Sequence, residues 1–247
     1  MDKTQSLALV KEQAKALAES SPLLTEYSPI IISHPFTKCG IVPYCKNNDF
    51  STYTQLDITK SPENLHAWQE MVKEQINLCH SVEQIYFLLN PTYQMLFVEK
   101  IKNLVSREEF SKLLADAYVN TEYPNTNPNV SKQTMINLFK YADKKHLMSE
   151  EEFEIYQGFN NAVKIYRGVS SPSKKHICAM SWTLGKNIAN KFANRYFEDG
   201  YVFEAEIDKE HILAFFNCRQ EAEVVVDCKH LKNVKQLLSN DENSEKE

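Results

Sequence analysis

The first two thirds of the chain carry apolar residues at helical spacing. Near the start, Leu7, Val10, Ala14 and Leu17 recur every three or four residues, which predicts an amphipathic helix. The same pattern predicts further helices over residues 61–79, 90–104, 106–118, 131–146 and 149–159.

Several of these helices have recognisable start signals. Ser61 precedes Pro62, a good first helical residue. Ser149 is followed three residues later by Glu152, the spacing of a capping box, and Ser106 begins its helix in the same way. Residues 28–60 read instead as loop with short strands. Residues 123–130 form a polar, proline-containing linker.

Around residue 162 the period changes from helical to alternating. The predicted strands and the single helix (185–197) cover residues 162–169, 174–183, 185–197, 200–208, 211–217 and 221–227. The last residues, 239–247, are polar and charged, which favours disorder.

The elements together predict an α+β fold. We expect a mostly helical region over residues 1–145, a β-rich core over 146–238 and an acidic tail over 239–247. The size and acidic balance of the first region make recognition of a target or partner its expected role.

Composition narrows the class of protein. The 247 residues are 43% hydrophobic and 25% charged, as in an ordinary globular domain. There is no apolar run of about 20 residues and no secretory leader pattern. We therefore expect a cytoplasmic protein, or one delivered by a route that needs no signal peptide, without a membrane partner. A net charge of −5 with no strongly basic segment argues against a general nucleic-acid binder.

Cysteine and glycine usage exclude several kinds of site. The six cysteines form no CxxC pair, so we expect free buried thiols and no metal site. The five glycines include neither GxGxxG nor a P-loop, so any nucleotide must be held in another way.

The first chemical motif is Tyr166-Arg167-Gly168 in a predicted strand. An arginine inside a half-buried strand is either part of a structural ion pair or a fork for binding phosphate. Gly168 would then let a ligand approach the backbone.

The second motif is Ser181-Trp182-Thr183, at a strand end before a helix. In a strand the two hydroxyls share one face and Trp182 faces the other way. In a purely structural interpretation the two hydroxyls belong to cap or turn residues. In a functional interpretation they hold a ligand or a catalytic carboxylate in place by hydrogen bonds.

The third motif is Glu221-Ala222-Glu223, directly before three valines. In a strand both carboxylates share one face, either towards solvent or at the mouth of a buried sheet. At such a mouth they repel, which raises a pKa, and they suit stabilisation of developing positive charge or a general base.

Arg, then Ser-x-Thr, then Glu-x-Glu in this order resembles the R-S-E class of mono-ADP-ribosyltransferases. The likeness covers residues 160–228 and includes the helix after Thr183. It implies a core of two packed, mainly antiparallel sheets, with NAD as substrate in the cleft between them and no metal.

The resemblance also implies roles for the residues. Glu223 is catalytic and hydrogen-bonds the NAD ribose, Ser181 positions Glu223, and Thr183 supports the ribose side. Arg167, followed by Gly168, clamps phosphate or ribose oxygens.

In the resemblance Glu221 orients or deprotonates the acceptor, and a glutamate there favours arginine. Phe192, Phe215 and Phe216 are candidates to stack on nicotinamide, although core packing explains each as well.

Two departures leave the acceptor open. A tryptophan stands inside the serine motif, and the loop before Glu221 is short. The acceptor is therefore a protein arginine or a nucleic-acid base, as in phage-defence toxin–antitoxin systems. The alternatives are an NAD glycohydrolase, with water as acceptor, and an inactive module that binds NAD or a partner. An antitoxin or inhibitor protein is a further expected partner.

Overall fold

The computed structural model describes residues 3–45, 53–121, 127–170, 177–195 and 200–237. The chain forms two compact units, Met1–Leu113 and Leu114–Glu247. This division precedes residue 145, where the functional boundary was expected, so the helices after residue 130 belong to the same unit as the β-sheet. The predicted tail at 239–247 and residues 123–126, half of the predicted linker, lie outside the described residues.

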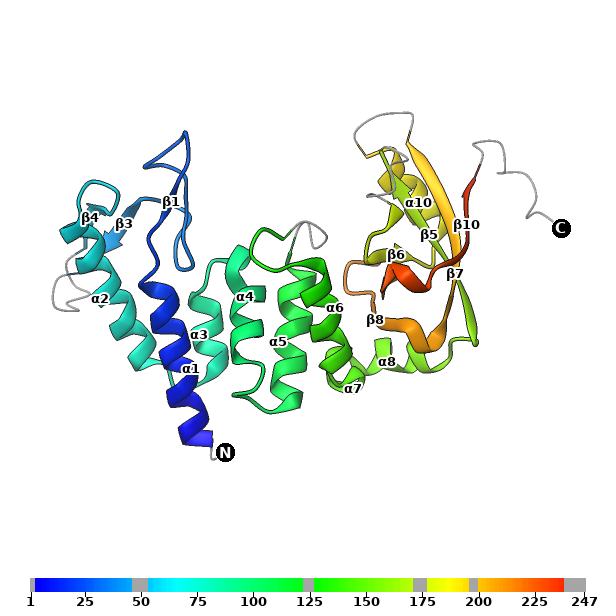
Figure 1. Cartoon of the computed structure of the whole chain (residues 1–247), viewed down its shortest axis with the longest axis horizontal. Coiled ribbons are helices and arrows are strands. Elements are labelled where there is room, and N and C mark those ends of the chain that lie inside the picture. Colours follow the sequence, from blue (N-terminus) through cyan, green and yellow to red (C-terminus); the bar gives the residue numbers. More distant parts are fainter. Residues whose placement is uncertain (1–2, 46–52, 122–126, 171–176, 196–199, 238–247) are drawn as a thin grey trace. The chain divides into compact units, whose positions relative to one another are not determined.

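The N-terminal unit is mainly helical (Figure 1). Its elements are α1 (Lys3–Ala18), β1 (Leu23–Leu24), β2 (Ile32–Ser33), β3 (Ile41–Tyr44), β4 (Thr54–Asp57), α2 (Pro62–Leu78), α3 (Val82–Leu88), α4 (Pro91–Ile101) and the first part of α5 (Arg107–Val119). The strands form two small antiparallel pairs, β1 with β2 and β3 with β4. Helix α3 was not predicted because its seven residues are too few to establish a period.

The predicted helix starts are confirmed at the level of single hydrogen bonds. Ser61 accepts from the Asn64 backbone N–H and Ser106 from that of Glu109. Ser149 forms the complete capping box with Glu152. Because each cap satisfies a backbone N–H without a partner inside the helix, it contributes about 1 kcal/mol.

The C-terminal unit combines short helices with one antiparallel sheet. Its elements after α5 are α6 (Lys132–Tyr141), α7 (Lys144–Leu147), α8 (Glu150–Gln157), β5 (Ala162–Val169), β6 (Ser181–Thr183), α10 (Lys186–Ala193), β7 (Tyr201–Asp208), the 3-10 turn Lys209–His211, β8 (Ile212–Phe216), β9 (Glu223–Val226), the 3-10 turn Cys228–His230 and β10 (Lys232–Leu237). The prediction of an α+β chain with a helical N-terminal region is therefore confirmed.

Six strands lie in the order β10-β7-β5-β6-β9-β8. Two separate sheets were expected, but hydrogen bonding makes one. Its halves, β10-β7-β5 and β6-β9-β8, are joined by one residue pair, Tyr166 opposite Thr183, whereas β5 and β7 pair over eight positions from Ala162 to Val169. The strand pairing is therefore shortest between β5 and β6, which carry the first and second sequence motifs.

Strand β10 was not predicted. Its residues are Lys, Asn, Val, Lys, Gln and Leu, and the first five are exposed. Among the described strands it pairs with β7 alone, at the edge of the sheet. An edge strand facing water lacks the apolar alternation that identifies inner strands, and its lysines suit that position.

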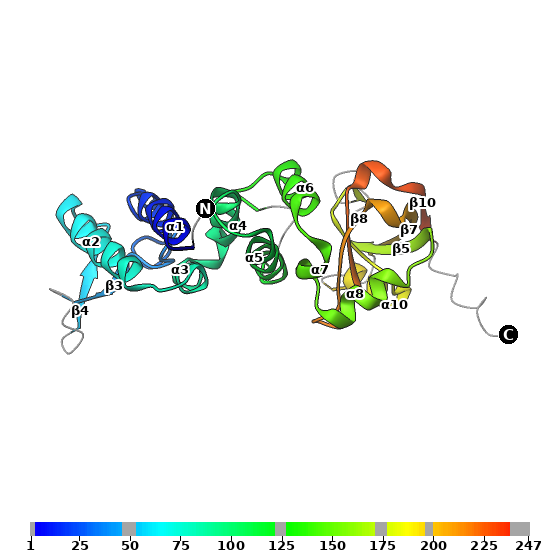
Figure 2. The same ribbon diagram turned by 90° about the horizontal axis from the view of Figure 1, so that it is seen from below.

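Helix α10 packs against β5 and β7 (Figures 1 and 2). The approach is close enough to require glycine: a Cβ at Gly168 would lie 1.9 Å from the carbonyl oxygen of Ala189, and one at Gly200 would lie 1.9 Å from that of Ala193. Ala189, Ala193 and Val202 form the buried cluster between helix and sheet.

Two cysteines form a disulfide, Cys178–Cys228, which corrects the expectation that all six are free thiols. The cause is the register of β6 and β9. Ser181 pairs with Val225, and the Val226 N–H donates to the Met180 carbonyl at 2.8 Å. Continuing this register past Ser181 brings Cys178 opposite Cys228. Cys39, Cys45, Cys79 and Cys218 are free.

Within the described ranges, no helix combines the length and apolarity needed to cross a bilayer.

Candidate functional site

The three sequence motifs lie on three adjacent strands. Arg167 is on β5, Ser181 on β6 and Glu223 at the start of β9, with Thr183 directly opposite Glu223. The Arg167 Nη1 donates to the Ser181 carbonyl, and the Ser181 side chain hydrogen-bonds the Glu223 carboxylate. Residues far apart in sequence thus form one connected polar group.

Glu223 is a buried carboxylate, with 7% of its surface exposed. Burial raises its pKa above the ordinary value, and the negative charge of Glu221 adds to this. Hydrogen bonds from Ser181 and Tyr118 and the positive charge of Arg219 act in the opposite direction. The carboxylate is therefore costly to ionise and is surrounded by donors that favour its ionised form.

Arg167 is half-buried beside this carboxylate. Burial lowers the pKa of its guanidinium to about 10, while the neighbouring charge of Glu223 opposes that shift. It remains a cation at neutral pH. A desolvated guanidinium attracts anionic oxygens more strongly than a solvated one.

Glu221 does not share a strand face with Glu223, as the sequence pattern had suggested. Strand β9 begins at Glu223, and Ala222 has a φ of 43°, in the left-handed region. The alternation of a strand therefore does not extend back to Glu221. Its side chain is 33% exposed and lies 3.7 Å from the Nε of Arg219.

Thr183 ties the end of β6 to the loop of residues 217–222. Its hydroxyl donates to the Glu221 carbonyl at 2.7 Å and accepts from the Gly185 N–H at 3.1 Å. This is the turn and cap role that the sequence allowed. Its predicted role towards the ribose of NAD stays a prediction. Trp182 faces the core, 2% exposed.

The 217–222 loop is held from both ends. The Asn217 N–H donates to Glu152 Oε1 at 2.6 Å, and Asn217 Oδ1 accepts from the Ala222 N–H at 3.0 Å. Gln220 also has a positive φ, 58°. Hydrogen bonds at both ends and two positive φ angles restrict the backbone of this short loop, from which Arg219 and Glu221 project.

Gly168 has a packing role in the structure. The missing side chain makes room for the α10 backbone, and contact with a ligand there stays a prediction. Among the aromatic candidates, Phe215 and Phe216 are buried in the core, while Phe192 is 37% exposed.

Tyr118 is a site residue that sequence reasoning missed. It lies in the last turn of α5, fully buried, and its hydroxyl donates to Glu223 Oε1 at 3.0 Å. The available signal was a tyrosine on the apolar face of a helix, in line with Leu114. Such a residue requires a partner for its hydroxyl, but the sequence does not say which.

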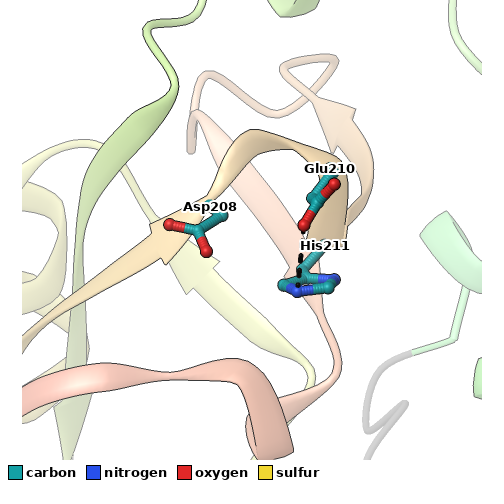
Figure 3. Close-up of side chains that lie close together, drawn as sticks. All are labelled: Asp208, Glu210 and His211. Carbon is teal, nitrogen blue, oxygen red and sulfur yellow. Dashed lines mark ion pairs between the residues drawn. The ribbon is translucent and has the colours of Figure 1, made fainter.

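A second group of ionisable side chains lies between β7 and β8 (Figure 3). Ligand-type atoms of Asp208, Glu210 and His211 are all within 4.8 Å of one another. However, Asp208 pairs with Lys232 at 2.5 Å, and the His211 ring stacks on His230 at 3.7 Å. These protein contacts explain the cluster, and the Glu210 side chain is 78% exposed. The candidate site is therefore placed at Glu223.

The arrangement around Glu223 suits one kind of chemistry. A fixed carboxylate in a poorly solvated position stabilises positive charge that develops next to it, because the surrounding protein screens less than water. The guanidinium of Arg167 offers a fork for phosphate oxygens.

Comparison with known proteins gives no match to a family model, to a curated protein sequence or to a solved structure.

Proposed function

We propose that the chain is an NAD-dependent mono-ADP-ribosyltransferase of the R-S-E class, acting as a toxin or effector inside cells. The observation that supports this most is the connected group of Arg167, Ser181 and Glu223 on three adjacent strands, with the carboxylate buried.

In the proposed reaction Glu223 acts on the ribose next to nicotinamide. The bond between the ribose carbon and the pyridinium nitrogen breaks, and its electron pair leaves with neutral nicotinamide. The positive charge moves to the ribose as an oxocarbenium, which the Glu223 carboxylate stabilises. An acceptor lone pair then forms the new bond to that carbon, and the acceptor proton passes to Glu221 or to water.

Arg167 serves this reaction by binding. The Arg167 guanidinium is close enough to Glu223 for their charges to interact. Diphosphate oxygens bound by Arg167 would therefore place the ribose near the Glu223 carboxylate. Ser181 links the two residues, because its backbone carbonyl accepts from Arg167 and its side chain bonds Glu223.

The acceptor is proposed to be a protein arginine. Glu221 supports this, since its partly exposed carboxylate already lies beside a guanidinium, that of Arg219. A nucleic-acid base, as in phage-defence toxin–antitoxin systems, is the alternative macromolecular acceptor, and water would make the protein an NAD glycohydrolase.

The test uses purified protein, NAD labelled in its ADP-ribose part, and total cell lysate. Glu223→Gln should reduce NAD turnover by at least about a hundredfold, because an aligned electrostatic contact to the transition state is lost. Glu206→Gln is the matched control: this β7 glutamate bonds Asn233 at 2.7 Å, away from the site, and its variant should keep full activity. Full activity of Glu223→Gln would reject the proposal.

The location of the label separates the alternatives. Label that survives nuclease but not protease supports transfer to protein, and the reverse pattern supports transfer to nucleic acid. Free ADP-ribose without a labelled macromolecule supports the glycohydrolase. If the wild type binds NAD or a partner protein without any turnover, the inactive binding module is correct. Glu221→Gln should keep NAD cleavage but lose transfer if Glu221 serves the acceptor.

For the N-terminal unit we propose recognition of that macromolecular target, or of an antitoxin-like inhibitor. Support comes from large apolar side chains exposed around β1: Leu23, Leu24, Tyr27 and Ile30 are each more than 60% exposed. Replacing Leu24 and Ile30 by serine should lower the modification of the target and leave cleavage of NAD alone unchanged. Equal modification by both proteins would contradict this role.

A further inference from the structure

Tyr118 places a hydroxyl at the candidate carboxylate from a helix that the sequence motifs do not include. It is fully buried, and its bond to Glu223 Oε1 is 3.0 Å long. Phenylalanine would fill the same space without a polar group to desolvate. The hydroxyl is therefore better explained by its effect on Glu223 than by packing.

An aromatic cage fixes the direction of this hydroxyl. The Tyr118 ring lies edge-on to Phe139 of α6, with centroids 5.0 Å apart, and beside Phe216 of β8 at 5.8 Å. Phe139 and Phe216 also contact each other, at 6.5 Å. Because side chains from two other elements, α6 and β8, pack against the ring, it cannot rotate away without disturbing the core.

Tyr118 also stays a donor over the working pH range. Burial raises its pKa well above the ordinary value, and the charge of Glu223 adds to this, so the phenol keeps its proton. The other groups that face Glu223 are Ser181 from β6, Arg167 from β5, and Arg219 and Glu221 from the 217–222 loop.

We propose that Tyr118 is a positioning residue for Glu223: held by Phe139 and Phe216, its hydroxyl orients the carboxylate and helps to keep it ionised for the transfer reaction. This inference rests on the proposed function. It extends the functional unit back to α5, which the sequence had assigned to a separate recognition region.

The test is Tyr118→Phe in the full chain, measured as steady-state NAD consumption across pH. The turnover number should fall about tenfold to a hundredfold, the cost of one hydrogen bond to a charged group. The KM for NAD should stay within about twofold, since Tyr118 does not bind NAD. The acid limb of the pH profile should move to higher pH, because the pKa of Glu223 rises when a donor to its ionised form is lost.

The chain offers a matched control in Tyr86→Phe. Tyr86 is also fully buried, and its hydroxyl also donates over 3.0 Å, but to Gln94 in the N-terminal unit. Its variant should keep both the turnover number and the pH profile. If Tyr118→Phe behaves like this control, the inference is overturned.

A second measurement does not depend on activity. The carboxyl of Glu223 can be titrated by carbon-detected NMR in the wild type and in Tyr118→Phe. A higher pKa in the variant supports the inference, and an unchanged pKa overturns it. Failure of the two proposals is distinguishable: a fully active Glu223→Gln rejects the proposed function, whereas an inactive Glu223→Gln beside a fully active Tyr118→Phe rejects only the inference.

Discussion

The two units bury different kinds of polar side chain. Among the described residues, the buried polar side chains of the N-terminal unit are His34, Gln69, Asn90, Gln94 and Ser111, and those of the C-terminal unit are Glu152, Thr183, Glu223 and Asp227. The first set is amides, a hydroxyl and a neutral imidazole. The second set contains three carboxylates, which cost far more to remove from water.

The partners of these groups show what the difference teaches. In the N-terminal unit Gln69 donates to the Ser20 carbonyl at 3.2 Å and Asn90 to the His34 carbonyl at 3.3 Å, so both amides join loops to helices. In the C-terminal unit Glu152 accepts two backbone N–H groups, of Ser149 and Asn217. These contacts are sufficient to explain the burial structurally.

The two other buried carboxylates of the C-terminal unit, Asp227 and Glu223, differ in the direction in which their pKa is shifted. Burial acts to raise the pKa of Asp227, yet hydrogen bonds from Lys140 and from the Lys229 N–H bring it below its ordinary value. For Glu223 burial prevails and the pKa is raised. In Glu223 the hydrogen bonds and nearby positive charge do not fully offset the effect of burial on the pKa. We expect such a carboxylate to act chemically, because perturbed pKa values cluster at functional sites.

The largest expected effect concerns the close packing of α10 against the sheet of the C-terminal unit. Gly168→Ala should lower the free energy of unfolding by about 3 kcal/mol or more, because the new Cβ would lie 1.9 Å from the Ala189 carbonyl oxygen and α10 must move. Urea unfolding measures this.

Gly158→Ala is the matched control. A Cβ there meets nothing closer than the Ile155 carbonyl at 3.4 Å, so the change should be neutral or slightly stabilising. Equal stability of the two variants would show that α10 does not pack on Gly168 as described.

The next effect concerns His34, a buried histidine of the N-terminal unit. Burial lowers the pKa of His34 from 6.5 to about 4, against backbone hydrogen bonds to Ser20 and Ala18. Between these values the unfolded chain binds a proton that the folded one does not, so stability falls as pH falls, by a total of the order of 3 kcal/mol.

Unfolding by urea at several pH values between 7 and 4 checks the His34 effect. His34→Gln removes the titrating group and should flatten the stability curve in this window. A curve as steep as that of the wild type would assign the acid sensitivity to other residues.

Glu152→Gln tests whether a buried carboxylate of the C-terminal unit is structural. Glutamine has one side-chain oxygen, so either the Ser149 or the Asn217 N–H loses its acceptor, at a cost of about 1 to 3 kcal/mol. Glu151→Gln, exposed on the same helix, should change stability by less than about 0.5 kcal/mol. Thermal unfolding of both variants decides, and equal melting temperatures would contradict the structural role.

The smallest effect is the stability of Glu223→Gln. A raised folded-state pKa means that wild-type stability increases as pH falls from neutral through that pKa towards 4.5, the ordinary value. The variant lacks this dependence and should be more stable at neutral pH by about 0.5 to 1 kcal/mol, a cost typical of functional residues. A clear loss of stability at neutral pH would make Glu223 a structural residue like Glu152.

Much of the fold could be predicted because local patterns determine it. The capping box of Ser149 and Glu152 can be predicted from its spacing alone. Strands β5 and β7 follow apolar alternation, and β8 and the valines of β9 are short, continuous apolar runs. Predictions failed where long-range pairing decides. Strand β10 exists because β7 offers an edge, and the Cys178–Cys228 pair follows from register.

The sequence identified three residues of the candidate site, but it did not predict how they are arranged. The motifs named Arg167, Ser181 and Glu223, which the sheet brings together. They could not show that a positive φ at Ala222 separates Glu221 from the strand. Nor could they show Tyr118, because 105 positions separate it from Glu223 and no short motif spans that distance.

The register that pairs β6 with β9 also limits where this chain tolerates changes in length. Cys178–Cys228 and Thr183–Glu223 bracket one antiparallel ladder, with equal numbers of residues between them on each strand. One residue inserted into or deleted from either strand would turn the side chains beyond it to the opposite face and move Ser181 out of register with Val225. Insertions and deletions that preserve the site should therefore fall outside residues 178–183 and 223–228, which makes those segments poor places for tags, grafted loops or circular permutation.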